Sequence, residues 1–281
     1  MEVAFSRGLE DAAAAWRAGA ADIAARRDTR LERERHTVAE TVTGLESSHI
    51  GYRTDRHPFD NELVRKAFSH ALERDRLFGD KDSAERPAGR GGLLPPAMPG
   101  HSHRISPPFD LELAKRLLAE AGYPDAKGLP EIKIAIPEHW ELRESNLAAQ
   151  WGRLGVRIKV LSAPLESFFT GPLEAAHAWC GGWSADFPDP EGFIPPLLAN
   201  YPIFRNEEIT ALVGKARTCR DQEQRIQLFR DIDRLLVADR CALVPIGYGA
   251  AVLLRRPWVH GLHAMPLLGP STPLDQVIVR H

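Results

Sequence analysis

The chain has 281 residues, of which 43% are hydrophobic and 26% are charged, as is usual for a globular protein. This length is enough for one large domain or two ordinary ones, each with a buried core. The 36 basic and 38 acidic residues leave a net charge of -2, which argues against a dedicated nucleic-acid-binding protein. No stretch approaches the ~20 uninterrupted apolar residues that are needed to span a bilayer.

The amino-terminal residues predict a short helix and no signal peptide. Residues 9–19 are rich in alanine and end in Gly19, a common helix stop. Charged residues such as Glu2 and Arg7 interrupt the apolar run that a signal peptide needs. The protein is therefore expected either to stay in the cytoplasm or to begin inside a longer chain. The charged run 25–36 is expected to be a solvated helix face or an exposed linker, because acids alternate with its arginines.

The rest of the chain alternates between predicted strands and helices, which favours an α/β fold. A helix with an N-cap at Asp60 and a stop at Gly79 is followed by a Pro/Gly-rich loop, 86–108, that is too long for a passive connection. A second helix is predicted from Asp110 to Gly122. Strands are predicted over 37–44, 49–53, 131–137, 156–161 and 241–249, and further helices over 144–155, 206–217 and 221–238.

The sequence contains no recognised catalytic motif. The run Gly89–Gly92 lacks the Lys-Ser/Thr of a phosphate-binding loop and is expected to be a flexible turn. The pairs His101/His103 and His260/His263 lie in no helical frame with an acid, so no metal site, cofactor or catalytic residue is predicted. The three cysteines are too few and too scattered for a disulfide framework, although one pair could form a bridge.

The stretch CGGWSADFPDPEGF, residues 180–193, places a tryptophan and an acid three residues apart in a predicted loop. Its glycines and prolines exclude the interior of a helix. The carboxylate of Asp186 and the ring of Trp183 could together anchor a cationic group, such as the α-ammonium of a peptide. Alternatively, Trp183 belongs to the core and Asp186 caps a turn before Pro188. Local chemistry by itself favours the structural alternative.

Several segments, taken in order, resemble the carboxy-terminal part of a family 5 extracellular solute-binding protein. This ABC-transporter class includes oligopeptide-, dipeptide- and nickel-binding proteins. No single segment is decisive, but together they span almost the whole chain. The matching segments are AWRAGAADIA, HIGYRTDRHPFDNELVRKAFSHALERDRLF, GGLLPPAMPGH, FDLELAKRLLAEAGYP, GWSADFPDPEGF and ALVPIGYGAAVLLRRPWVHGL.

The resemblance implies a periplasmic-binding-protein-like (type II) α/β architecture, in which two lobes close on a ligand. Residues 54–249 resemble the second lobe, whereas residues 1–53 and 250–281 resemble pieces of the first lobe. Full-length relatives carry a long amino-terminal portion before the first matching segment. The chain is therefore expected to be a truncated member whose first lobe is incomplete and whose missing amino-terminal lobe would supply the other wall of the cleft.

The resemblance also implies a ligand site. Asp186 occupies the place of the acid that pairs with the ligand's α-ammonium, and Trp183 matches the aromatic residue in the cleft wall. Tyr248 is a further candidate lining residue, with a half-buried hinge tyrosine as its structural alternative. Cys180 stands where some oligopeptide-binding relatives have an arginine, so sugars, amines and metal chelates stay open as ligands beside peptides.

The function implied by the resemblance is that of a non-catalytic solute-binding component of an ABC importer. Lobe closure on a small solute would present a changed surface to the transporter's membrane subunits, in an extracytoplasmic location. An alternative is a ligand-sensing module of a larger cytoplasmic regulator, which fits the absent signal peptide. A hydrolase or metal enzyme using the loop histidines is disfavoured, because no nucleophile–base pair is recognisable. A remnant without binding activity would expose an apolar patch where the missing lobe should sit.

Overall fold

A computed structural model describes residues 9–25, 36–78, 87–138, 142, 144–201, 206–265, 269–270 and 278–279. By its internal contacts the chain divides into two compact units. Unit 1 comprises Met1–Gly44 and Ala250–His281, and unit 2 comprises Leu45–Gly249. The assignment of lobes to 1–53, 54–249 and 250–281 stays a prediction. Most of the predicted charged segment 25–36 lies outside the described residues.

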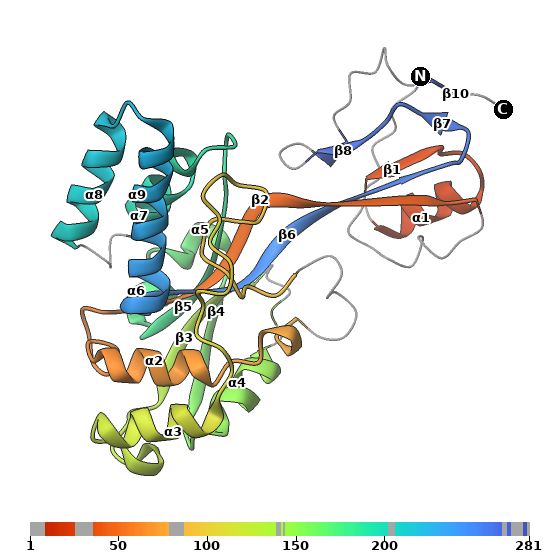
Figure 1. The fold of residues 1–281 in the computed structure, drawn as a ribbon. Helices are drawn as coiled ribbons and strands as arrows, with labels where there is room; N and C mark the ends of the chain where they lie inside the picture. Colours follow the sequence, from red (N-terminus) through yellow and green to blue (C-terminus); the bar gives the residue numbers. More distant parts are fainter. Residues whose placement is uncertain are drawn as a thin grey trace. The chain divides into compact units, whose positions relative to one another are not determined.

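Unit 2 is built on a mixed sheet with helices on both faces (Figure 1). The strand order is β1-β6-β2-β5-β3-β4, in which β1 and the ends of β2 and β6 belong to unit 1. Within unit 2, β2 pairs antiparallel with β5, and β3 pairs parallel with both β4 and β5. The strands predicted over 37–44 and 49–53 form one continuous strand, β2, because the residues between them also pair with β5. The strands are β1 (Ile23–Ala25), β2 (Val38–Tyr52), β3 (Ile132–Pro137), β4 (Ile158–Ala163), β5 (Ala178–Ser184) and β6 (Leu243–Arg255).

Helices α2 (Glu62–His70), α3 (Leu111–Glu120) and α4 (Glu144–Gly152) cover one face of the sheet (Figure 1). The N-cap of α2 is Asn61, whose side chain accepts a hydrogen bond from the Leu63 amide, so the predicted cap at Asp60 is wrong by one residue. The predicted extension of this helix to Gly79 is also wrong, because α2 ends at His70 and a separate 3-10 turn follows.

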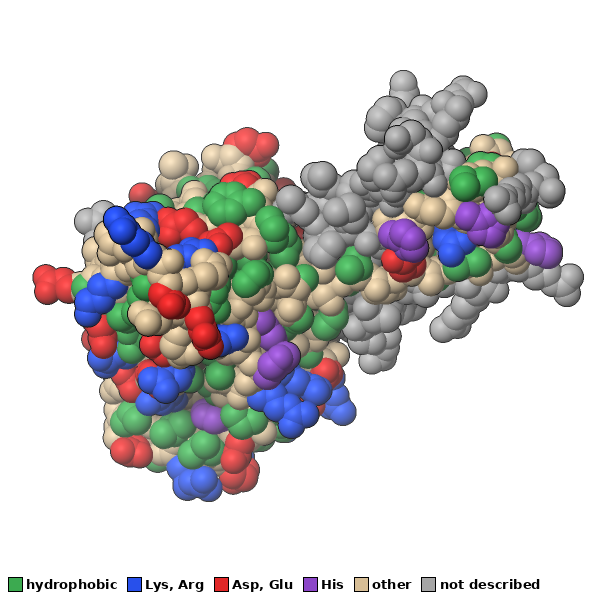
Figure 2. Space-filling model, turned by 45° about the horizontal axis from the view of Figure 1, so that its top comes forward, with side chains coloured by type: hydrophobic (Ala, Val, Ile, Leu, Met, Phe, Trp, Pro, Cys, Tyr) green, Lys and Arg blue, Asp and Glu red, His purple; other side chains and the backbone are tan. Residues whose placement is uncertain are grey.

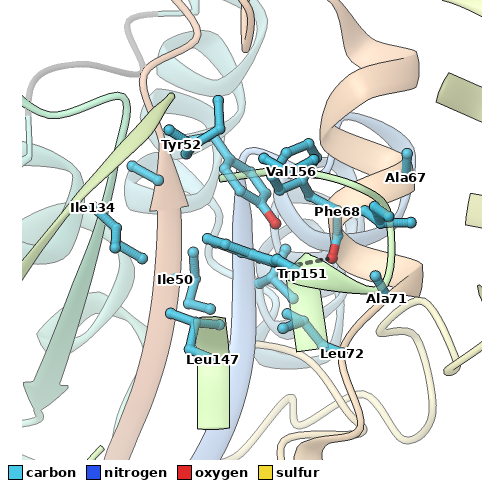
Figure 3. Packing of buried hydrophobic residues seen from close by; sticks show 14 of the residues in the cluster. Ile50, Tyr52, Ala67, Phe68, Ala71, Leu72, Ile134, Leu147, Trp151 and Val156 are labelled. Atoms are coloured by element: carbon cyan, nitrogen blue, oxygen red, sulfur yellow. Dashed lines mark hydrogen bonds between the residues drawn. The ribbon is translucent and has the colours of Figure 1, made fainter. Parts of the chain in front are cut away.

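Four aromatic side chains form the centre of the core on this face (Figure 3). Tyr52 from β2 stacks on Phe59 with ring centroids 4.5 Å apart, and Phe68 from α2 meets the Trp151 ring edge-to-face at 5.0 Å. The indole Nε1 of Trp151 donates to the Phe68 carbonyl at 3.0 Å, so this large ring is buried without leaving its donor unpaired.

The other face of the sheet is covered by five further helices. Trp179 on β5 packs there with Phe193, Phe229 and their neighbours in a second core. The helices predicted over 206–217 and 221–238 are confirmed, except that the end of the second widens into a π-helical turn, Leu235–Asp239. These helices are α5 (Leu165–Phe168), α6 (Pro172–Ala175), α7 (Ile194–Asn200), α8 (Glu207–Thr218) and α9 (Gln222–Arg234).

The long Pro/Gly-rich loop is held against α9 and β6 by hydrogen bonds to buried polar side chains. The carboxylate of Asp233 accepts a hydrogen bond from the Leu93 amide at 2.7 Å, and the Tyr248 hydroxyl donates to the Gly92 carbonyl at 2.7 Å. A Cβ on Gly92 would lie only 1.7 Å from the Asp233 carboxylate, so glycine is required at this approach. The expectation that Gly89–Gly92 is a flexible turn is therefore wrong, because tertiary contacts hold it in place.

Among its described residues, unit 1 contains one short helix and five short strands besides the ends of β2 and β6. Trp16 on α1 (Leu9–Arg17) is fully buried, and the Arg256 guanidinium lies 4.1 Å from its ring centroid. The β1 strand pairs antiparallel with the end of β6. The remaining strands form two small ladders, β7 (Val259–His260) with β10 (Ile278–Val279), and β8 (Ala264–Met265) with β9 (Gly269–Pro270).

We expect Trp151→Ala to destabilise unit 2 by about 3–5 kcal/mol, because it removes a buried indole and leaves a cavity between α2, α4 and β2. Urea denaturation followed by circular dichroism measures the effect. Phe187→Ala is the matched control, because this aromatic side chain is 47% exposed and should cost less than about 1 kcal/mol. Equal effects of the two substitutions would contradict the description of this core.

We expect Asp233 to make folding stability depend on pH between about 4 and 7. Burial raises the pKa of this carboxyl from 3.8 to about 7, so the unfolded chain ionises first as pH rises. Its contribution is fully present below the unfolded pKa and is lost as pH approaches 7, by on the order of a few kcal/mol.

Asp233→Asn removes this titration. The free energy of unfolding of the wild type minus that of the variant should therefore fall between pH 4 and 7, in urea titrations at several pH values. A constant difference across this range would show that Asp233 does not titrate there.

Candidate functional site

Strand β5 carries the first half of the stretch that the sequence singles out. Residues 180–184 of this stretch lie in β5 and not in a loop, because they pair antiparallel with residues 46–50 of β2. Ser47 of β2 lies opposite Trp183, and His49 lies opposite Gly181. Directly opposed residues of an antiparallel pair share a face of the sheet, so these four residues face the layer that contains α5 to α9.

Trp183 is half-buried on this face and lines a cavity of about 350 Å³. Its indole Nε1 donates to the Gly192 carbonyl at 3.2 Å, which fixes the ring. The remaining walls are mostly apolar, and Leu165 and Phe169 are 48% and 41% exposed there. We call this space the aromatic cavity; it is lined by Glu46, Pro137, Leu165, Phe168, Phe169, Gly181, Gly182, Trp183, Ser184, Asn200 and Tyr201.

Tyr201 lines the aromatic cavity, and His49 packs against the Tyr201 ring. The Tyr201 ring stacks on Trp179 with centroids 5.3 Å apart and meets the His49 ring edge-on at 5.8 Å. A Cβ on Gly181 would lie 2.7 Å from the Tyr201 hydroxyl oxygen, so only glycine lets this ring approach the strand. Neither ring nitrogen of the buried His49 has a hydrogen-bond partner among the described residues, and burial lowers the pKa of His49 to about 3. His49 is therefore neutral at physiological pH.

Asp186 lies two residues beyond the end of β5. It is exposed, and its carboxylate makes no hydrogen bond or ion pair with the part of the chain that the structure describes. The next acid, Asp189, is tied down: Arg225 of α9 pairs with both of its carboxylate oxygens, and the Glu191 amide donates to it at 2.9 Å. The Arg225 partner and these hydrogen bonds lower the pKa of Asp189 although burial acts to raise it. The loop is therefore anchored at Asp189, which leaves the Asp186 carboxylate presented to solvent.

Tyr248 lies apart from the residues that line the aromatic cavity. It is 3% exposed on β6, and its hydroxyl donates to the Gly92 carbonyl of the long loop. Burial raises the pKa of this phenol well above its usual range. The structure thus brings Trp183 into a cavity, places Asp186 on the adjoining loop, and gives the Tyr248 hydroxyl a partner within unit 2.

The aromatic cavity combines π-faces and apolar walls with a few polar groups, as small-ligand sites commonly do. Such a lining can hold an apolar side chain, and the nearby carboxylate of Asp186 can pair with a cationic group. Among the described residues, no three His, Cys, Asp or Glu side chains lie close enough together to hold a metal ion. Cys180, Cys219 and Cys241 are all free, so the disulfide that the sequence left open does not form.

Sequence reasoning missed Tyr201, His49 and the phenylalanines of α5. A partial signal was present in β2, where Ser47, His49 and Gly51 alternate with Ile50 and Tyr52. Small or polar residues on one face of a buried strand indicate that something bulky approaches that face. The identity of the approaching ring, Tyr201, could not be inferred, because it comes from the end of α7, far away in the sequence.

None of the described helices is both long and apolar enough to cross a lipid bilayer. A family model described as "Bacterial extracellular solute-binding proteins, family 5 Middle" matches residues 7–204. The chain is 28% identical to heme-binding protein A of Haemophilus influenzae over 242 residues, which are 79% of this chain and 43% of that protein. It is 27% identical to the periplasmic oligopeptide-binding protein OppA of Escherichia coli over 241 residues, covering 80% of this chain and 43% of OppA.

Solved structures show the same fold. The periplasmic binding protein DppA of Helicobacter pylori, in complex with the peptide STSA, superposes with a TM-score of 0.73 at 22% identity, over 97% of this chain and 55% of that one. The predicted periplasmic-binding-protein-like α/β fold is confirmed by this likeness. The chain spans less than half the length of the relatives named above and little more than half of this structure.

We expect Gly181→Ala to destabilise unit 2 by about 1–3 kcal/mol, because the new methyl group forces Tyr201 off its stack with Trp179. Gly214→Ala is the matched control. It lies in α8 with no atom within 4 Å of the added Cβ, and should stabilise by about 0.5–1 kcal/mol. Thermal unfolding of both variants measures the difference, and a neutral Gly181→Ala would show that Tyr201 is not held against β5.

Proposed function

Because the chain belongs to the family 5 bacterial extracellular solute-binding proteins, we propose that it binds a peptide-like solute at the aromatic cavity as part of an ABC importer. The observation that carries this proposal is the exposed Asp186 carboxylate two residues after Ser184, which itself lines a cavity with aromatic walls. The family consists of solute-binding proteins, so the proposed role is non-catalytic. Its members work outside the cytoplasm, and the membrane subunits of a transporter are the proposed partners.

In this proposal, one side chain pairs with the charged group of the solute and others contact its apolar part. Asp186 pairs with the α-ammonium of the solute, because its carboxylate has no partner among the described residues. Trp183 supplies a wall held by its bond to Gly192, and Phe169 and Leu165 offer exposed apolar surface to a side chain of the solute. The role of Tyr248 as a lining residue stays a prediction. Its hydroxyl already donates a hydrogen bond to the Gly92 carbonyl.

The position of Cys180 limits how the other end of a peptide can be recognised. Its side chain is fully buried in the core with Ile50 and Ala178, on the face of β5 opposite Trp183. Position 180 therefore offers no charge to a solute in the aromatic cavity. We propose that the ammonium end and an apolar side chain provide the recognition, so a peptide and a hydrophobic amine bind in the same way.

We expect di- and tripeptides with an apolar first residue to raise the melting temperature of this chain. Binding to the native state stabilises it by about 2.7 kcal/mol at one hundred times the dissociation constant. Asp186→Asn should abolish the shift, and N-acetylation of the peptide should abolish it in the wild type, because each change removes one partner of the ion pair.

The control is Glu120→Gln, an exposed carboxylate on α3 away from the aromatic cavity. It should leave the shift unchanged. Peptide binding that persists in Asp186→Asn, or that ignores N-acetylation, would remove Asp186 from the site. No shift with any free peptide or amine would overturn the proposal for this chain.

A further inference from the structure

A second cavity, remote in sequence from the aromatic cavity, lies where α2 ends and the long loop returns to α3. Its volume is about 690 Å³. Four arginines and two carboxylates contribute to its walls, so cations exceed anions by two. We call it the arginine cavity; it is lined by Leu72, Glu73, Arg74, Asp75, Arg76, Arg90, Arg104, Ser106, Pro107, Pro108 and Phe109.

Arg74 is the buried member of this set, with only 6% of its surface exposed. Its Nε donates to the Pro245 carbonyl at 2.8 Å and its Nη1 to the Pro107 carbonyl at 2.7 Å. Its Nη2 finds no acceptor among the described residues, and Arg74 forms no ion pair with any of their carboxylates. Burial accordingly lowers the pKa of Arg74 to about 10. A buried guanidinium without a counter-charge is costly, so an anion nearby would be strongly favoured.

The two carboxylates in the walls pair with Arg76 and Arg90, and neither forms an ion pair with Arg74 or Arg104. Glu73 pairs with Arg76 at 3.2 Å and also with Arg153, whereas Asp75 pairs with Arg90 at 2.5 Å. Each of the two acids therefore already forms an ion pair with at least one exposed arginine. Arg104 is exposed and makes no ion pair or hydrogen bond within the described ranges. Among the described residues, neither Arg104 at the surface of the arginine cavity nor Arg74 in its wall forms an ion pair.

Basic side chains also cluster on the surface of unit 2. Figure 2 shows Lys and Arg side chains gathered beside His side chains at one place on the surface of unit 2, whereas elsewhere on that face acidic and basic side chains are interspersed. Concave sites lined by one sign of charge attract counter-ions more strongly than flat ones do. Guanidinium groups also match the oxygen pairs of phosphate and carboxylate groups.

We propose that the arginine cavity is a binding site for a small polyanion that carries phosphate or carboxylate groups, separate from the proposed solute site. Arg104 and Arg90 contact its oxyanion oxygens, while Arg74 stabilises its charge from the wall. The volume accommodates more than a single inorganic ion, so an anion with two or more charged groups fits it better than a monoanion.

Isothermal titration calorimetry of the whole chain at low ionic strength tests this assignment, with pyrophosphate and citrate as probes and chloride as the monoanion comparison. We expect saturable binding of pyrophosphate or citrate, and a loss of affinity of about tenfold or more in Arg90→Gln/Arg104→Gln. Both side chains are exposed, so the variant should keep the unfolding temperature of the wild type.

Arg116→Gln is the matched control, because it removes an exposed arginine of α3 that does not line the cavity. Its affinity for the probes should stay within about twofold of the wild type, since a distant exposed charge is screened by solvent. The proposal is overturned by any of three results: no saturable binding, unchanged affinity in the double variant, or equal weakening in Arg116→Gln. The last result would indicate diffuse attraction to the surface.

A peptide titration of the same double variant separates this proposal from the solute site. Peptide-induced stabilisation that depends on Asp186 should be the same in Arg90→Gln/Arg104→Gln as in the wild type. If peptide binding and polyanion binding were lost together, the arginine cavity would not be a separate site, and this inference would fail even if the proposed function held.

Discussion

Strand β5 is hydrogen-bonded to β2 on one edge and to β3 on the other, so its side chains must alternate between two helical layers. Cys180 consequently enters the core beneath α2 to α4, whereas Trp179, Gly181 and Trp183 face α5 to α9. A shift of one residue in this register would exchange the two sets and move Trp183 away from the aromatic cavity. The site therefore follows from the pairing of backbone groups before any side chain is considered.

Two glycines on neighbouring strands make room for the aromatic layer. The Trp179 ring lies where a Cβ on Gly51 would be, at 2.1 Å from its nearest atom, and Tyr201 closes over Gly181 in the same manner. The rings stack on each other and leave Trp183 half-buried beside them. Close packing on one side of the cavity thus coexists with exposed apolar walls on the other, as a ligand-binding surface requires.

Two buried ionisable side chains, Asp233 and Arg74, hold the long loop in place. They differ in how the energetic cost of burying their charge can be reduced. Asp233 holds the Leu93 amide and can take up a proton, because burial raises its pKa to about 7. Arg74 holds the Pro107 and Pro245 carbonyls, but a guanidinium keeps its proton throughout the physiological pH range. The anion that we propose for the arginine cavity would supply its counter-charge, so the two buried charges suggest different chemistry although both anchor the same loop.

The sequence by itself determined the alternation of helices and strands, because apolar periodicity and helix stops such as Gly122 are local properties of the chain. It also identified the stretch with Trp183 and Asp186, since Gly and Pro mark an unusual segment without any tertiary information. Only the tertiary structure decided that residues 180–184 belong to a strand, that Tyr201 lies beside Gly181, and that the Arg74 Nη2 is buried with no acceptor among the described residues. These features depend on residues far apart in the chain, whose contacts and burial no local pattern encodes.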